Sequence, residues 1–340
     1  MNNLEQYKDL VAGIRVEHPS YTSAIQKIHR AIEAAGRSTA PACVMVIGEP
    51  GTGKTSVIKE VCEDFEMQRV ESGVRATLVS ARAPSDGTPK GTAERLLRAL
   101  GDEHWARGSL SNMTSRLYKL LEGVGCKGIL IDEFQHLADK GQQSSLHRAS
   151  DWLKVLVEDQ PYALIAAGLP SSLRVVNQNR QLTRRFSAPI VMPAFSWSVN
   201  SERLAWTGIL GAFQGCMEPF ELPDLQAEEN AYRMHLASGG RIGVSAKVLE
   251  QAVRDAIADG RTKISLANLQ VAYEDAIWIP EPFPVKAGPF GAEIEDLFGC
   301  KFEASASEEE VDPEPVGRVV TRRSAAASSK AAQRELAKAF

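Results

Sequence analysis

Apolar positions along this chain follow two patterns, one typical of buried strands and one typical of helices. Short apolar runs that suit buried parallel strands occur at residues 42–47, 77–80, 129–131, 164–167 and 190–192. Segments with helical spacing separate these runs. The alternation predicts an α/β fold with a five-stranded parallel sheet that is covered by helices on both faces.

Helical spacing dominates on both sides of this predicted sheet. Before it, Ile25, Ile28, Ile32 and Ala35 form an apolar stripe that predicts a lead-in helix. After about residue 196 the strand pattern stops and a small all-helical lid is expected, with Trp278 among its core aromatic residues. The predicted lid helices are 199–213, 225–237, 244–258 and 266–278.

The composition of the chain changes after residue 278. A proline-rich stretch is followed by an acidic segment at residues 308–314 and then by a basic end rich in alanine and serine. Such a sequence buries too little apolar surface to offset its ordering entropy, so we expect a mostly disordered tail. Within it, the apolar and acidic segment 288–298 has a form suited to docking on a partner.

Composition limits the possible functions only weakly. The chain has 340 residues, 44% of them hydrophobic, which is enough for two domains and a substantial core. Five scattered cysteines without a C-x-x-C pair argue against a disulfide framework or a zinc site. The start lacks a signal pattern and no apolar run could span a bilayer, so we expect a cytoplasmic protein without a membrane partner. The net charge of −4 neither indicates nor excludes nucleic-acid binding.

The segment after the first predicted strand has the spacing of a phosphate-binding loop, G-x-x-x-x-G-K-[ST]. Its glycines let backbone N–H groups surround the phosphates of a nucleotide, Lys54 supplies a positive charge, and the Thr55 hydroxyl can bind Mg²⁺. A predicted helix follows, so the phosphates meet its N-terminus. We therefore expect ATP and Mg²⁺ as cofactors. The expected nucleotide-binding residues are Gly48, Glu49, Pro50, Gly51, Thr52, Gly53, Lys54, Thr55, Ser56 and Asp132.

Asp132 and Glu133 follow the third predicted strand in the manner of a Walker B site. An aspartate at this end of a parallel strand can hold Mg²⁺ through water, together with Thr55. The adjacent glutamate can orient or deprotonate the attacking water. The two acids therefore predict an ATPase, with Glu133 and Lys54 as catalytic residues.

A phosphate-loop core followed by a helical lid is the layout of AAA+ proteins. We divide the chain into an N-terminal helical extension (1–41), a nucleotide-binding core (42–195), a lid (196–279) and a mostly disordered, partner-binding tail (280–340). In this layout an arginine before the fifth strand would reach the γ-phosphate in a neighbouring subunit. Arg184 and Arg185 both fit, and a solvated surface pair is the alternative.

Arg241 begins a predicted lid helix, where a sensor 2 arginine would swing towards the γ-phosphate; a surface arginine at a helix start is the alternative. At the end of the fourth strand, AAA+ proteins are expected to carry an Asn, Thr or Ser residue, called sensor 1, that polarises water, and this chain lacks it. The fourth strand ends in Ala166, Ala167 and Gly168, and Ser171 provides the nearest hydroxyl group. We expect ATP hydrolysis to be slow and dependent on assembly.

Several of these segments together resemble the TniB/TnsC family of transposition regulators, relatives of the Mu target-DNA ATPase. The resemblance covers about residues 10–278. Its most discriminating marks are the run Ile-Asp-Glu-Phe-Gln-His-Leu at 131–137 and Ala-Gly-Leu-Pro at 167–170. Further marks are Arg-Val-Glu-His-Pro at 15–19, the phosphate loop, Gln-Leu-Thr-Arg-Arg-Phe at 181–186 and Gly-Gly-Arg-Ile at 239–242.

The resemblance implies an ATP-dependent protein that assembles as a ring or helical filament on double-stranded DNA without reading its sequence. A target selector of the TniQ/TnsD type would load or cap the assembly, the DDE transposase would bind it, and ATP turnover would take it apart. Two other interpretations remain open. One is an AAA+ ATPase of another machine, such as a secretion-associated ATPase or a helicase loader, and the other is a nucleotide-gated scaffold that does not hydrolyse ATP.

The residues themselves give a weaker indication of DNA contact. A Gly/Pro-rich loop at 80–92 carries cations and hydroxyl groups that could follow a phosphate backbone. An ordinary surface loop is the alternative. The candidate DNA-binding residues are Arg82, Lys90 and Thr92 in this segment and Arg116 and Lys119 on a later helix.

Overall fold

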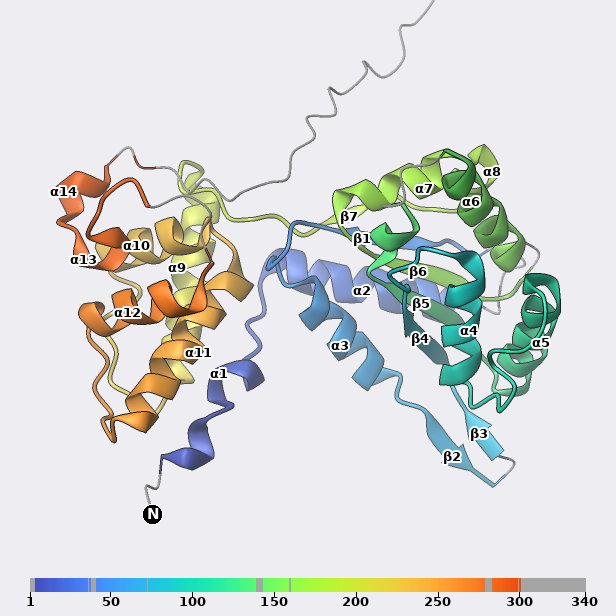
Figure 1. The fold of residues 1–340 in the computed structure, drawn as a ribbon, viewed down its shortest axis with the longest axis horizontal. Helices are drawn as coiled ribbons and strands as arrows, with labels where there is room; N and C mark the ends of the chain where they lie inside the picture. The colour runs from blue at the N-terminus through green and yellow to red at the C-terminus, as the bar shows by residue number, and fades with distance from the viewer. Residues whose placement is uncertain are drawn as a thin grey trace, which may run out of the picture. The chain divides into compact units, whose positions relative to one another are not determined.

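The computed structural model describes residues 4–35, 37, 41–71, 73–138, 143–158, 160–278, 283–298 and 300, all within one compact unit, residues 1–302. Its central sheet has five parallel strands in the order β4-β5-β6-β1-β7 (Figure 1). The strands are β1 (Val44–Ile47), β4 (Leu78–Arg82), β5 (Gly128–Asp132), β6 (Ala163–Gly168) and β7 (Ile190–Val191). The five predicted strands and the α/β fold class are confirmed.

Both faces of this sheet are buried, because successive strand residues point into two different hydrophobic clusters. Met45 and Ile47 join one cluster, and Val44 and Val46 join the other. The helices of the first cluster are α4 (Pro89–Ala99), α5 (Leu110–Gly123), α6 (Gln143–Val157), α7 (Leu173–Asn177) and α8 (Arg180–Thr183). Those of the second are α2 (Pro19–Ala34), which is the predicted lead-in helix, and α3 (Lys54–Asp64).

A two-stranded hairpin lies outside the central sheet. Its strands β2 (Gln68–Val70) and β3 (Gly73–Arg75) pair antiparallel with each other (Figure 1). The sequence pattern did not predict it, since strands of three residues are too short to show an alternation.

The predicted lid is helical and has its own hydrophobic cluster, in which Trp206 is fully buried. Its helices are α9 (Asn200–Gly215), α10 (Glu228–Ser238), α11 (Ile242–Ala258) and α12 (Leu266–Ala276). Residues before α2 contribute to the same cluster through α1 (Leu10–Gly13), where Val11 is buried. The expectation for Trp278 was wrong: α12 ends before it and its side chain is 86% exposed.

Part of the expected tail is folded onto the lid. Short helices α13 (Gly288–Gly291) and α14 (Ile294–Leu297) follow residue 283, and the Phe290 and Leu297 side chains are buried. Buried Arg233 of α10 donates through one nitrogen to the carbonyls of Pro289 (3.0 Å) and Ala292 (2.6 Å). Two of the apolar side chains that suggested a docking segment, Phe290 and Leu297, are therefore used inside the lid, whereas Phe298 is 69% exposed. The rest of the expected tail, residues 301–340, lies outside the described residues.

Within the described residues, no helix is both long and apolar enough to cross a lipid bilayer.

Candidate active site

The loop between β1 and α3 has the backbone that its glycines require. Gly51 (φ 82°) and Gly53 (φ 98°) occupy the left-handed region, where a side chain would be strained. A Cβ atom at Gly48 would lie 2.5 Å from the carbonyl oxygen of Met192, after β7. The loop therefore needs glycine at Gly48 and Gly53, the two glycines of the predicted motif, and also at Gly51 between them. Helix α3 begins directly behind the loop at Lys54.

The side chains at the phosphate loop and the start of α3 differ in their contacts and exposure. The Lys54 ammonium group donates to the carbonyl oxygens of Gly48 (2.6 Å) and Glu49 (2.8 Å), while the Thr52 side chain is buried. Burial lowers the pKa of Lys54, and the carboxylates of Glu133, Glu49 and Asp132 oppose that shift. Thr55 is exposed on the first turn of α3 and free to meet a ligand, as is Ser56.

Asp132 ends β5, whose carboxyl end lies at the same edge of the sheet as the phosphate loop. Burial raises the pKa of Asp132, and the charge of Glu133 adds to this, while Arg82 and Lys54 oppose it. Arg82 is the register partner of Asp132 on the neighbouring strand β4. Asp132 and Lys54 therefore lie close enough for the charge of each to shift the pKa of the other.

The oxygen atoms that Asp132 and Thr55 offer are of the kind that bind Mg²⁺ together with a nucleotide. Carboxylate and hydroxyl oxygens are the ligands that Mg²⁺ takes, and a cation would relieve the burial of Asp132. Among the described residues, no group of three or more His, Cys, Asp or Glu residues could hold a metal ion. An ion held by Asp132 and Thr55 would complete its coordination with water and phosphate oxygens.

Glu133 has an unusual backbone conformation and a specific partner. Its φ of 53° is the one positive value found for a non-glycine residue in the described parts of the chain. Its carboxylate accepts a hydrogen bond from the amide of buried Gln135 (2.5 Å). The Gln135 side-chain oxygen accepts in turn from the backbone N–H of Leu169 (3.1 Å), just beyond β6. Sequence reasoning missed Gln135, although the residue stands within a motif that it singled out.

The start of lid helix α11 contacts the phosphate loop. The backbone N–H of Gly243 donates to the carbonyl oxygen of Gly51 (2.7 Å), and a Cβ atom at Gly243 would lie 3.0 Å from that oxygen. Arg241 precedes the helix and donates to the carbonyl of Ser238 (3.1 Å). Burial lowers the pKa of Arg241, and the charge of Glu49 opposes this shift. Arg241 thus lies beside the loop, and its sensor 2 role stays a prediction.

The structure distinguishes Arg184 from Arg185, which the sequence could not. Both follow α8, and the Arg184 side chain is exposed. Arg185 is half-buried, and one of its terminal nitrogens is buried without a hydrogen-bond partner. Burial raises the pKa of the Cys43 thiol to about 11, and the nearby charge of Arg185 opposes this. Arg184 is therefore the one that faces solvent.

The five candidate DNA-binding residues do not form one surface. Lys90 and Lys119 are exposed, and Arg82 is exposed beside Asp132. The expectation for Thr92 was wrong, because its side chain is fully buried and its hydroxyl donates to the carbonyl of Thr88 (3.1 Å). The guanidinium of Arg116 already has partners within the protein, because it donates to the Asp102 carboxylate and to the carbonyls of Arg107 and His104.

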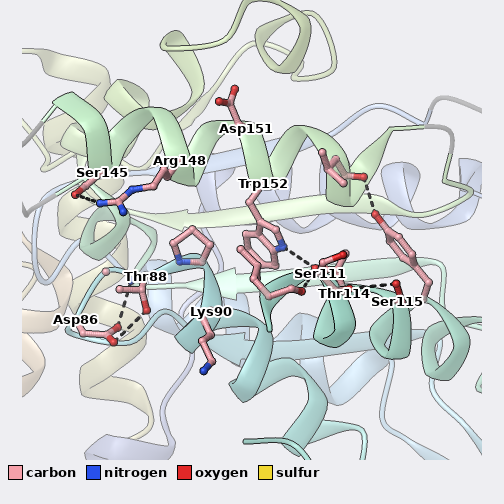
Figure 2. A pocket seen from close by; sticks show the side chains of 15 residues that line it. Asp86, Thr88, Lys90, Ser111, Thr114, Ser115, Ser145, Arg148, Asp151 and Trp152 are labelled. Atoms are coloured by element: carbon pink, nitrogen blue, oxygen red, sulfur yellow. Dashed lines mark hydrogen bonds between the residues drawn. The ribbon is translucent and has the colours of Figure 1, made fainter. Parts of the chain in front are cut away.

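A cavity of about 690 Å³ lies between α5, α6 and the loop before α4 (Figure 2). Tyr118 and Trp152 contribute to its mostly apolar wall, and Lys90 and Arg148 also line it. The Trp152 indole donates to the Thr114 hydroxyl (3.1 Å). None of the residues that line this cavity belongs to the phosphate loop or to the Asp132–Glu133 pair.

Comparison with solved structures shows the same fold at low sequence identity. The ORC2 protein of Aeropyrum pernix, solved as ADPNP-ADP complexes, gives a TM-score of 0.58 at 13% identity, over 79% of this chain and 71% of that one. The ORC1 protein of Aeropyrum pernix in complex with DNA gives 0.58 at 15% identity, over 79% and 69%. Cdc6p from Pyrobaculum aerophilum gives 0.56 at 14% identity, over 81% and 72%.

No curated protein matches the chain by sequence. Residues 10–197, more than half of the 340 residues, match the family of bacterial TniB proteins. These residues include the phosphate loop, the Asp132–Glu133 pair and both candidate arginines before β7. The chain therefore belongs to the TniB family and has the AAA+ ATPase fold.

Proposed function

We propose that this protein binds ATP with Mg²⁺ and hydrolyses it slowly within an assembly of its own copies. The observation that carries this proposal is the meeting of Lys54, Asp132 and Glu133 at one edge of the sheet, with Arg241 of the lid beside the same loop. The nucleotide complexes of the structurally similar ORC2 protein support it.

Each residue of this site has a task in the proposed reaction. The loop N–H groups and Lys54 bind the phosphates, and Thr55 and Asp132 hold the metal, the latter through water. The ion neutralises phosphate charge when bound. Glu133 accepts the proton of the attacking water. Arg241 contacts the γ-phosphate side of the loop when ATP is present, which makes the lid sensitive to the nucleotide.

Family membership supports a role in DNA transposition. We infer that the protein assembles as a ring or filament on double-stranded DNA and links a TniQ/TnsD-like target selector to the transposase. Lys90 and Lys119 are the exposed cations that would contact phosphates without reading bases. The ORC1 protein, which shares the fold, was solved with DNA.

The proposed division of the chain keeps the core at residues 42–195 and the lid from residue 196. We extend the lid beyond 279 to include α13 and α14, since both pack on it. A partner-binding tail would then begin after residue 302, where the compact unit ends.

Electron microscopy with duplex DNA tests this function. With a slowly hydrolysed ATP analogue and DNA together, we expect rings or filaments, because a triphosphate at the subunit boundary favours assembly. Samples without nucleotide are the control and should show dispersed protein. Monomers under saturating nucleotide and DNA would contradict the proposal.

A non-hydrolysing scaffold is the second candidate function. It is favoured by the end of β6, where Ala166, Ala167 and Gly168 offer no hydroxyl to polarise water. Phosphate release in the presence of DNA separates the two candidates, because a scaffold would release none above background.

Arg184, rather than Arg185, is expected to act on the nucleotide of a neighbouring subunit. Arg184→Ala should lower turnover of the assembly by about a hundredfold or more while ATP affinity stays unchanged, because the arginine stabilises charge in the transition state. Phosphate release and fluorescent nucleotide binding measure the two quantities. Arg180→Ala, which removes another exposed arginine from the same segment, is the matched control. Equal turnover of Arg184→Ala and wild type would contradict this assignment.

A further inference from the structure

The turn after β5 contains a buried side-chain amide, that of Gln135, whose oxygen and nitrogen both form hydrogen bonds. Gln135 lies in the short 3₁₀ helix Phe134–Leu137 and is 5% exposed. Its Oε1 accepts from the backbone N–H of Leu169, and its Nε2 donates to Oε2 of Glu133. Since a backbone N–H can only donate, the first bond fixes which end of the amide faces Glu133.

The amide occupies a space at the end of β6 that is open because Gly168 has no side chain. A Cβ atom at Gly168 would lie 2.5 Å from Oε1 of Gln135. Any side chain at Gly168, including a hydroxyl-bearing one, would therefore displace the Gln135 amide. The same Cβ atom would lie 2.5 Å from Oγ of Ser172, so the Gln135 amide and the Ser172 hydroxyl together fill the space beside Gly168.

The backbone around Glu133 is fixed as well. The Glu133 N–H donates to Oδ1 of Asp132 (2.9 Å), and its carbonyl accepts from the N–H of His136 (3.0 Å). These bonds hold a positive φ that costs of order 1 kcal/mol or more in a non-glycine residue. Backbone strain of this kind persists only where the surrounding structure holds it in place, and it is concentrated at active sites.

We propose that Gln135 is a positioning residue for Glu133 and ties its carboxylate to the end of β6 in the orientation that accepts a proton from water. This rests on the proposed ATP hydrolysis. One oxygen of Glu133 is held by the amide, which leaves the other oxygen for the water. Gln135 thus supplies the polar link between the Walker B turn and the β6 strand that Ala166, Ala167 and Gly168 do not supply.

Substitution of Gln135 tests this role. Gln135→Met keeps the volume and removes both hydrogen bonds, so kcat should fall about tenfold or more while ATP affinity changes less than about twofold. The matched control is Gln270→Met. Gln270, in the lid, has two partners of the same kinds, since it accepts from the N–H of Phe290 (3.0 Å) and donates to the Glu274 carboxylate (2.8 Å). This control should keep wild-type turnover.

A double-mutant cycle separates positioning from general damage. If Gln135 acts through Glu133, adding Gln135→Met to Glu133→Gln should lower the residual turnover no further. A tenfold fall in both backgrounds would overturn the inference, as would unchanged or faster turnover of Gln135→Met. Should Gln135→Met fail to bind ATP, Gln135→Asn, whose shorter amide cannot bridge both partners, gives the same test. Wild-type protein that releases no phosphate would refute the proposed hydrolysis, whereas an active wild type with active Gln135 variants refutes only this inference.

Discussion

Replacing Lys54 with alanine is expected to abolish productive ATP binding and, with it, assembly on DNA. The ammonium group is half-buried between the carbonyls of Gly48 and Glu49, at the mouth of the phosphate loop. Removing this charge should weaken ATP binding by about a hundredfold, which corresponds to ~2.7 kcal/mol. Fluorescent nucleotide titration measures the affinity, and microscopy with DNA shows whether rings or filaments remain.

Lys59→Ala is the matched control for this experiment. Lys59 is on the same helix, α3, but its side chain is exposed on the helix surface. It should bind ATP and assemble like wild type. An alanine variant of Lys54 that still binds ATP with wild-type affinity would show that the loop is not the nucleotide site.

Replacing Glu133 with glutamine is expected to separate ATP binding from hydrolysis. The amide keeps the shape of the side chain but cannot accept a proton, so turnover should fall by about a hundredfold to a thousandfold. ATP affinity should stay close to wild type, because Lys54 and the loop are intact. Assemblies on DNA should persist with ATP itself, whereas wild-type assemblies are expected to persist only with a slowly hydrolysed analogue.

Phosphate release and time-resolved microscopy measure these two effects of Glu133→Gln. Glu122→Gln, at an exposed glutamate of α5, controls for the loss of one negative charge. Normal turnover of Glu133→Gln would show that another group activates the water, and the role assigned to Glu133 would then be wrong.

The central sheet and the phosphate site could be predicted because their signals are local. Strands buried on both faces are continuous apolar runs, and each of the five runs became a strand. The phosphate loop requires glycine at fixed positions, and Gly51 and Gly53 have the positive φ angles that explain their presence. The charges around Lys54 then follow from strand topology, since parallel strands end at one edge of the sheet.

Features that depend on tertiary contacts could not be predicted from local patterns. Thr92 was expected on a surface loop, yet it is buried on the inner face of α4. The sequence cannot show that Arg184 is exposed while Arg185 turns inwards, because the residues are neighbours with identical chemistry. Gln135 stood within a predicted motif, but its partner Leu169 is 34 residues away along the chain.

The contact between Arg233 and the segment after residue 283 sets a limit on how far the gene product can be shortened. A polypeptide that stops at residue 279 would lack the carbonyls of Pro289 and Ala292 that accept from this guanidinium. The apolar side chain of Leu236, which packs against Ala292 and Leu297, would also lose its cover, and an exposed apolar patch favours association between molecules. Polypeptides that end at the last long helix would be prone to aggregate, and those that run through residue 302 keep this apolar surface covered.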